Sequence, residues 1–276
     1  MLGKLLKYDL RSCFKRFLPL WAAIFALSCI CALTFRVEIM DSTLGRFVLK
    51  VLPPVLLGGV FIGTAVLVIV YICDQIYYGL LGESGYLMFT LPVSTSQLIF
   101  SKLLTALILE VISVAAACIS AFALVTLLDV QSMAAIFRNL PEMLSLFRDH
   151  PVPGGVYAIL AECVVLLLVL LGTFDLKIFA SIALGHLSRK KRVLMSLLAY
   201  VAFSVLLSML MSLLFKTDWL WHFGGINVIL TAHGVELTGL GGAAAAIGTV
   251  IGLAALLGAV YFLISHIILK KRLNLE

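Results

Sequence analysis

"LPPVLLGGVFIGTAVLVIVYIC", residues 52–73, is a stretch of 22 residues without one charged side chain. A helix rises about 1.5 Å per residue and the hydrocarbon core of a bilayer is about 30 Å thick, so about 20 apolar residues cross it. Pro53 and Pro54 stand near the start, where a missing backbone N–H does not interrupt helical hydrogen bonding. We therefore expect a transmembrane helix that opens at the two prolines.

The composition of the whole chain also indicates that lipid surrounds the protein. Of its 276 residues, 63% are hydrophobic and 12% are charged, whereas a soluble domain has about 25% charged residues. A soluble core cannot bury so much apolar surface, so the composition excludes an ordinary soluble protein. The net charge is +6, but the basic residues gather at the ends of apolar stretches. That arrangement is typical of membrane topology and not of nucleic-acid binding.

Five further segments have the length and apolar character of a membrane span. The expected fold class is therefore an all-α integral membrane protein with six transmembrane helices in a single domain, residues 1–276. Six cysteines fall mainly inside apolar runs, and only Cys29 and Cys31 lie close together, so we expect no metal or redox site. The expected spans are 18–36, 52–73, 103–128, 155–184, 193–215 and 240–269.

Lysine and arginine residues are divided unequally between the two sides. Thirteen lie at the N-terminus, at Lys102, after the fourth span and after the sixth, and six lie in the opposite loops. Because cytoplasmic flanks are enriched in basic residues, we expect both termini and segment 74–102 in the cytoplasm. The expected location is the plasma (inner) membrane of a bacterium.

The first 17 residues, MLGKLLKYDLRSCFKRF, are amphipathic. Helical spacing places four basic residues in one stripe and four apolar residues in an opposing stripe. The basic residues are Lys4, Lys7, Arg11 and Lys15, and the apolar residues are Leu6, Leu10, Phe14 and Phe17. Such a helix is expected to lie in the cytoplasmic interface, with its charges toward anionic head groups, before Pro19 turns the chain into the first span. A basic flank that only fixes the orientation is the alternative.

A half-polar stretch, GESGYLMFTLPVSTSQLIFSK at 82–102, separates the second and third spans. It resembles the cytoplasmic loop between the second and third spans of ABC-2 type exporter permeases. Those loops have an acidic residue, a glycine, a leucine, a T/L-P-[VI]-S run and a lysine that opens the next span. The family often has Gly-Thr where this chain has Gly85 and Tyr86. The matching residues are Glu83, Gly85, Leu87, Leu91, Pro92, Val93, Ser94 and Lys102.

The resemblance implies partners and a mechanical role. In that family the permease pairs with a second permease, as a homodimer or a heterodimer, and with two ATP-binding subunits that hold ATP and Mg²⁺. The short helix before the proline docks on the ATP-binding subunit. By this resemblance the chain itself is not an enzyme and binds no cofactor. The residues expected to couple to the partner ATPase are Tyr78, Leu81, Glu83, Gly85, Leu87, Phe89 and Pro92.

The chemistry of the segment also suits docking. Aromatic and aliphatic residues in YYGLLGESGYLMF, residues 77–89, offer anchors to a soluble partner. Pro92 restricts Leu91 to extended conformations, which ends the preceding helix. Ser94 is placed to cap the next helix, with Gln97 three residues on as its capping-box partner. A connector without a partner is the alternative.

Four ionisable residues lie within the apolar segments, where a charge is costly and marks a functional hypothesis. Glu110, in the third span, and Glu162, in the fourth, are candidates for the transport path. Pairing with hydroxyl groups inside the bundle is the alternative. Asp175 and Lys177 are expected to reach the cytoplasmic interface, either to link to segment 74–102 or the N-terminal helix or simply to anchor the helix there. Because they stand two residues apart on a helix, we do not expect them to pair with each other.

The expected function comes from the resemblance and not from a catalytic motif. The chain has no G-x-x-x-x-G-K-[ST], H-E-x-x-H or G-x-S-x-G sequence. We expect a permease that couples ATP hydrolysis by a separate subunit to export of a peptide, drug or other amphiphile. An ion-coupled carrier and a membrane-embedded hydrolase, both using Glu110 and Glu162, are the alternatives. Gly248 and Gly252 form a G-x-x-x-G motif on the sixth span, which we expect to pack within the subunit, with a dimer seam as the alternative.

Overall fold

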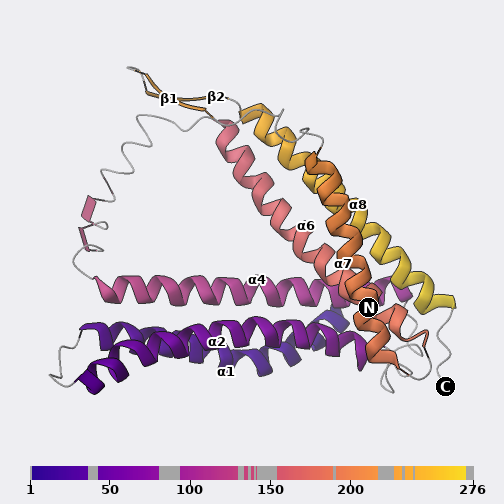
Figure 1. The fold of residues 1–276 in the computed structure, drawn as a ribbon, viewed down its shortest axis with the longest axis horizontal. Helices are drawn as coiled ribbons and strands as arrows, with labels where there is room; N and C mark the ends of the chain where they lie inside the picture. The colour runs from indigo at the N-terminus through magenta and orange to yellow at the C-terminus, as the bar shows by residue number, and fades with distance from the viewer. Residues whose placement is uncertain are drawn as a thin grey trace. The chain divides into compact units, whose positions relative to one another are not determined.

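The computed structural model is mainly helical (Figure 1). Its described residues form six long helices, each with a stretch long and apolar enough to cross a membrane, which confirms the six predicted spans. The helices are α1 (Leu2–Arg36), α2 (Thr43–Tyr77), α4 (Thr95–Leu128), α6 (Gly154–Gly185), α7 (Arg192–Lys216) and α8 (Leu240–Lys271). The structure describes residues 2–36, 43–80, 94–129, 134–135, 138–139, 141, 154–188, 191–216, 227–231, 234–238 and 240–271.

The last three helices match their predicted spans at both ends. The ends of α6, α7 and α8 all lie within two residues of the predicted limits. Each of these apolar runs is bounded by residues that stop a helix or favour water, so hydropathy alone locates the helix ends. A one- or two-residue difference is within the normal uncertainty of a helix boundary.

The first two helices correct two expectations about proline. Pro19 lies inside α1, and Pro53 and Pro54 lie inside α2, ten residues after its start at Thr43. The predicted turn at Pro19 and the predicted helix start at Pro53 are therefore wrong. A proline removes one helical hydrogen bond, but local adjustments re-satisfy the freed carbonyl, so apolar helices tolerate it. An interfacial position for residues 1–17 stays a prediction.

The start of α4 confirms the predicted cap and shortens the predicted segment. The backbone N–H of Gln97 donates to Ser94 Oγ at 3.4 Å, as expected of an N-cap serine. α4 therefore begins at Thr95, eight residues before the predicted span. Lys102 lies inside the helix and is only 3% exposed, instead of standing at its opening. The end of α2 at Tyr77 and the start of α4 at Thr95 both lie inside the predicted segment 74–102, whose central residues 81–93, called segment 81–93 below, lie outside the described residues.

A two-stranded antiparallel hairpin between α7 and α8 was not expected of an all-α chain. β1 (Asn227–Thr231) pairs with β2 (Gly234–Thr238), with Thr231 opposite Gly234 and Asn227 opposite Thr238. The strands are rich in β-branched residues, and the glycine adjoins the turn, which are the features of a hairpin. The sequence analysis assigned no strands to this loop, so the hairpin corrects the expectation of an all-α fold.

The chain divides into two compact units. Unit 1 consists of residues 1–72 and 104–144, and unit 2 of residues 73–103 and 145–276. Most of α2 and most of α4 therefore belong to unit 1, whereas the end of α2 and the beginning of α4 belong to unit 2. Both flanks of segment 81–93 lie in the unit that also contains α6, α7 and α8.

Aromatic and polar contacts join α1 to α2 and to α4 in unit 1. The ring of Phe17 packs edge-on against Tyr71, with 5.5 Å between ring centroids, and the Cys13 thiol donates to the Tyr71 hydroxyl at 2.8 Å. Trp21 Nε1 donates to Ser113 Oγ at 3.2 Å. Cys13 and Phe17 are buried, so this side of α1 forms part of the core of unit 1.

Unit 2 is built around close packing of α6 on α8. The Thr173 hydroxyl lies 3.1 Å from the Ala254 carbonyl of α8 and 2.7 Å from the Val169 carbonyl of its own helix. α7 contacts α8 through Phe203 and Tyr261, whose ring centroids are 5.1 Å apart. A hydrogen bond between helices requires that their backbones approach closely, so α6 and α8 form the tightest described pair of this unit.

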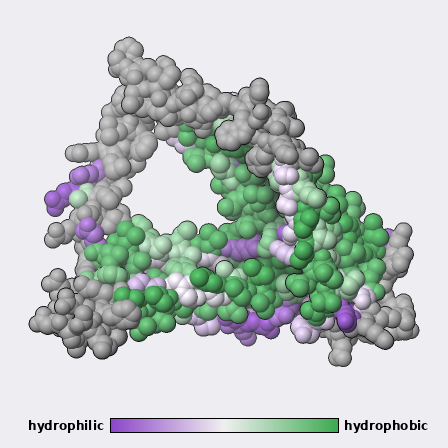
Figure 2. Space-filling model, in the orientation of Figure 1, coloured by the Kyte–Doolittle hydropathy of each residue, from purple (hydrophilic) through white to green (hydrophobic). Residues whose placement is uncertain are grey.

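The outer faces of the helices suit a lipid environment. Large apolar side chains stand exposed along them, as Ile62 on α2 (69%) and Leu206 on α7 (61%) illustrate. Figure 2 shows apolar residues over much of the visible helical surface. Hydroxyl groups in the helices are satisfied locally, as when Thr64 donates to the Val60 carbonyl at 2.7 Å. These helices are therefore adapted to a solvent that offers no hydrogen bonds.

The contact between α6 and α8 predicts an asymmetric response to two glycine substitutions. A Cβ atom at Gly258 would lie 3.3 Å from Thr173 Oγ1 and 3.7 Å from Leu176 Cδ1, whereas one at Gly252 meets nothing within 4 Å. We expect Gly258→Leu to lower the free energy of unfolding by about 1–3 kcal/mol through overpacking. Gly252→Leu, on the same helix, is the matched control and should not. Denaturant unfolding in detergent measures both, and equal losses would contradict this packing.

Candidate functional site

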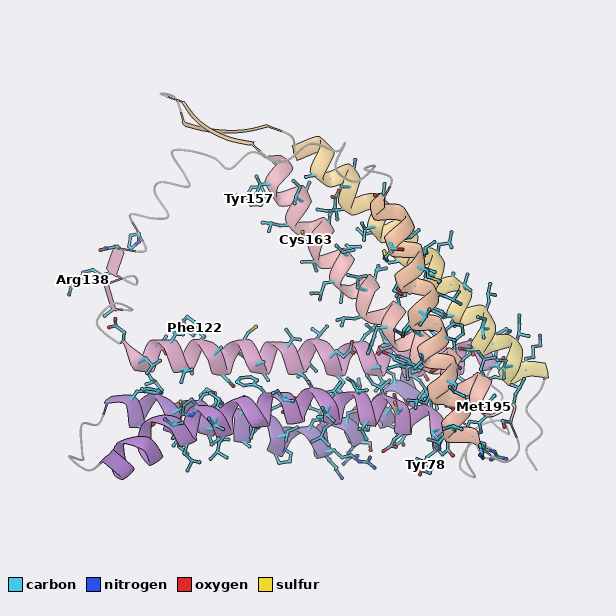
Figure 3. The ribbon with its side chains drawn as sticks, viewed as in Figure 1. Tyr78, Phe122, Arg138, Tyr157, Cys163 and Met195 are labelled. Carbon is cyan, nitrogen blue, oxygen red and sulfur yellow. The ribbon has the colours of Figure 1, made fainter. Side chains whose placement is uncertain are left out.

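The candidate site consists of the two helix ends that flank segment 81–93. We call residues 73–80 the entry root and residues 94–103 the exit root. Of the predicted coupling residues, Tyr78 is described: it lies in the entry root, is 64% exposed and projects from the end of α2 (Figure 3). The remaining predicted coupling residues lie outside the described residues and are Leu81, Glu83, Gly85, Leu87, Phe89 and Pro92.

The entry root is attached to the end of α6. The ring of Tyr77 lies 4.8 Å from the ring of His186, measured between centroids. Beyond the helix, the backbone N–H of Leu80 donates to the Ile76 carbonyl at 3.1 Å, which continues the helical turn. Leu80 is fully buried. The last residues before segment 81–93 are therefore held by a ring contact, a backbone hydrogen bond and burial.

The exit root is attached to the last third of α8. Thr95 Oγ1 lies 3.4 Å from His266 Nδ1, a long hydrogen bond, and the His266 ring is stacked parallel to Phe262. Leu98 and Ile99, one turn further along α4, are 3% and 1% exposed. Because α6 and α8 pack together, the two roots are attached to the same pair of helices.

His186 carries the distinctive electrostatics of the entry root. Within the described part of the chain, its Nε2 atom is buried without a hydrogen-bond partner. Burial lowers the pKa of His186, and the positive charge of Arg192 lowers that pKa further. The imidazole is therefore neutral near pH 7, and an uncharged ring packs against Tyr77.

Three polar residues at the roots were missed by sequence reasoning. Gln75 is 8% exposed, and both its amide atoms are buried without a partner among the residues described here, which costs about 1–3 kcal/mol for each such group. His186 and His266 make the ring and hydroxyl contacts of the two roots. In the sequence, each of the three is recognisable only as a polar residue near the end of an apolar run. That position does not indicate which residue the side chain contacts.

Asp175 and Lys177, the two charges expected at the cytoplasmic interface, are both buried. Asp175 is 0% exposed and Lys177 is 8% exposed. The Lys177 ammonium donates to Ser204 Oγ at 3.3 Å and lies 4.3 Å from the centroid of the Tyr200 ring. Ser204 is twelve residues, or about 18 Å, along α7 from Arg192. The ammonium thus extends between two helices, and its depth in a bilayer stays a prediction.

Glu110 and Glu162 belong to different units, so each is described with its own neighbours. Glu110, in α4 of unit 1, is 9% exposed; Glu162, in α6 of unit 2, is partly exposed. In each, Oε2 is buried and has no hydrogen-bond partner among the described residues. Pairing with hydroxyl groups is therefore not seen for these two oxygens, and a role in the transport path stays a prediction.

The G-x-x-x-G motif does not pack as expected. A Cβ atom at Gly248 or Gly252 would meet nothing within 4 Å in the described part of the chain, and both glycines are exposed. The close contact of α8 is made instead by Gly258, which follows the motif. The expectation that the motif packs within the subunit is therefore not met by the described residues.

Within the described ranges, no group of three His, Cys, Asp or Glu side chains is placed to hold a metal ion. No protein-family model, curated protein or solved structure matches the chain. The resemblance to ABC-2 permeases therefore rests on the residues of segment 82–102 themselves.

The lowered pKa of His186 predicts that acid destabilises the protein. Above about pH 6.5, the ordinary pKa of histidine, the imidazole is neutral in both the folded and the unfolded state. Below that pH the unfolded chain binds a proton that the folded chain resists, so the free energy of unfolding falls until the pH passes the lowered folded pKa. We expect the thermal midpoint to fall more between pH 7 and pH 5 in the wild type than in His186→Phe.

His186→Phe is the matched variant because it keeps an aromatic ring against Tyr77 and removes the titration. Arg192→Gln tests the second cause and should reduce the acid sensitivity only in part. Differential scanning fluorimetry in detergent measures all three proteins. Equal pH dependence of the wild type and His186→Phe would show that His186 does not govern this loss.

Proposed function

We propose that this chain is the membrane-spanning permease subunit of an ATP-binding cassette exporter. It lies in a plasma membrane with both termini and segment 81–93 in the cytoplasm. A separate subunit binds ATP and Mg²⁺ and hydrolyses the nucleotide, and a second permease completes the transporter. The proposal is supported by the six membrane-length helices, the loop residues that resemble ABC-2 permeases and the attachment of the two roots.

One observation carries the mechanical part of the proposal. Tyr77 at the entry root contacts His186 at the end of α6, and Thr95 at the exit root contacts His266 on α8. A flexible connector would not need to be held at both ends. A partner that moves segment 81–93 would therefore move the ends of α6 and α8 with it.

The division of α2 and α4 extends this movement to unit 1. The last residues of α2 and the first residues of α4 belong to unit 2, and the remainder of each helix belongs to unit 1. A helix transmits displacement along its axis because its backbone hydrogen bonds hold successive turns together. A displacement of segment 81–93 therefore reaches unit 2 through side-chain contacts and unit 1 through two continuous helices.

The substrate class in this proposal is an amphiphile, with peptides and drugs as examples. Lipid-facing side chains cover the helices, so a cargo with an apolar part has access from the bilayer. ATP binding closes two ATPase subunits, their movement reaches segment 81–93, and the helices change their arrangement around the cargo.

In this mechanism, binding of the ATPase to segment 81–93 and transmission of its movement to the helices depend on different residues, so variants can separate the two. Leu87→Asp places a carboxylate on the docking face and should lower capture of a phosphate-loop ATPase by about 30- to 1,000-fold, the effect of about 2–4 kcal/mol at a binding hot spot. Leu187→Asp, which changes an exposed leucine outside the segment (46% exposed), is the matched control and should retain capture. Tyr77→Leu should retain capture but lose ATP-driven transport, because it removes the ring contact with His186.

The measurements are affinity capture from detergent extract, with the ATPase identified by its phosphate-loop sequence, and ATP-driven transport in proteoliposomes. Abundance and monodispersity of the chain control for folding. Capture of the ATPase by Leu87→Asp at the wild-type level, together with full transport, would rule out segment 81–93 as the coupling element.

A further inference from the structure

A buried ammonium lies between α6 and α7, and its contacts with the described residues are to a hydroxyl and two aromatic rings. Lys177 is 8% exposed and donates to Ser204 Oγ at 3.3 Å. Its Nζ atom lies 4.3 Å from the ring centroid of Tyr200 and 5.5 Å from that of Phe174. Two aromatic faces and a hydroxyl stabilise a positive charge, but they do not neutralise it. A charge inside a membrane-length helix is costly and usually marks a function.

The hydrogen bonding around Lys177 leaves capacity for an anion. The Ser204 hydroxyl donates its own proton to the Tyr200 carbonyl at 2.8 Å, so it acts toward Lys177 only as an acceptor. An ammonium group has three donors, and Ser204 accepts one of them. Asp175, the nearest acid in the sequence, is two residues away on α6 and therefore lies on a different face of the helix. The remaining donors suit a carboxylate or phosphate group.

The packing of α7 provides access from the bilayer. From Arg192 to Ser212 no side chain of α7 is fully buried, whereas α6 is buried almost continuously from Gly172 to Ala183. The outer side chains of α7 are apolar and exposed, as Leu197 (61%) shows. The α7 side of Lys177 is therefore less enclosed by described side chains than the α6 side, and it is the side from which an apolar chain can approach the ammonium.

We propose that Lys177 binds the anionic head group of an amphiphile that enters from the bilayer between α6 and α7. The head group, a carboxylate or a phosphate, takes the ammonium donors that no described residue accepts, and the apolar chain lies along α7. The amphiphile is either a resident anionic lipid or an exported cargo; only its identification as cargo rests on the proposed function. The site itself requires no ATPase.

Ligand-induced stabilisation of the purified full chain tests the site. The protein is placed in phosphatidylcholine nanodiscs and titrated with oleate, with oleyl alcohol as a probe of the same chain length and no charge. We expect oleate to raise the thermal midpoint of the wild type, and Lys177→Met to weaken the apparent affinity by about 10- to 100-fold, the effect of losing one charge-assisted hydrogen bond. Lys191→Met, which removes an exposed lysine before α7, is the matched control and should bind as the wild type.

Additional ligands identify the source of the anion, and a second variant controls for misfolding of Lys177→Met. Stabilisation by phosphatidylglycerol but not by oleate supports the site and assigns it to a bilayer lipid; stabilisation by oleate supports the site for a mobile amphiphile. Lys177→Gln serves where Lys177→Met does not accumulate and should also lose oleate binding. Equal oleate affinity in the wild type and both Lys177 variants would overturn the proposal, as would stabilisation by inorganic phosphate alone. None of these results depends on ATPase capture, so the binding site can be disproved without disproving the proposed function, and the reverse.

Discussion

The absence of hydrogen-bonding solvent in a bilayer is the constraint on which the rest of this structure depends. A backbone that crosses lipid must satisfy its own polar groups, and a single chain segment achieves this only as a helix. Every membrane-length stretch described here is helical, including those that contain Pro19, Pro53 and Pro54. Side-chain hydroxyl groups follow the same rule, as Thr64 shows by donating to the Val60 carbonyl. Apolar faces are then free to contact lipid.

The same constraint explains which parts of the fold could be predicted. Hydropathy located α6, α7 and α8 to within two residues because the loss of apolar character and the end of the helix coincide there. It failed for α2 and α4, which continue as helix through polar residues before or after the apolar run. Hydropathy indicates which residues can contact lipid. A helix continues past the end of an apolar run when the flanking residues also favour a helix.

The candidate site was predictable only in its position. Segment 82–102 carries a local motif, and Ser94 has a local role as a cap, so both were recognised from the sequence. The contacts of Tyr77 with His186 and of Thr95 with His266 join residues that are distant along the chain. Nothing in the spacing of single aromatic or histidine residues specifies such a partner. Likewise, Lys177 was recognised as a charge near a helix end, but its contact with Ser204 depends on the packing of two helices.

The two units contain different candidate residues. Unit 2 holds both roots and the buried Lys177, and unit 1 holds Glu110 and the packed aromatic contacts of α1. The segment between the roots is joined to unit 1 by the continuous helices α2 and α4. In the proposed mechanism, unit 2 therefore contains the contacts that would meet a partner first.

The central claim is that segment 81–93 faces the cytoplasm, because only there does an ATPase meet ATP. The direct measurement is a set of fusions that join a reporter active only in the cytoplasm, or one active only outside, after Ser84, His150 and Glu276. The account predicts cytoplasmic signals after Ser84 and Glu276 and an external signal after His150. An external signal after Ser84 would contradict the account, since the segment would then lie on the wrong side of the membrane.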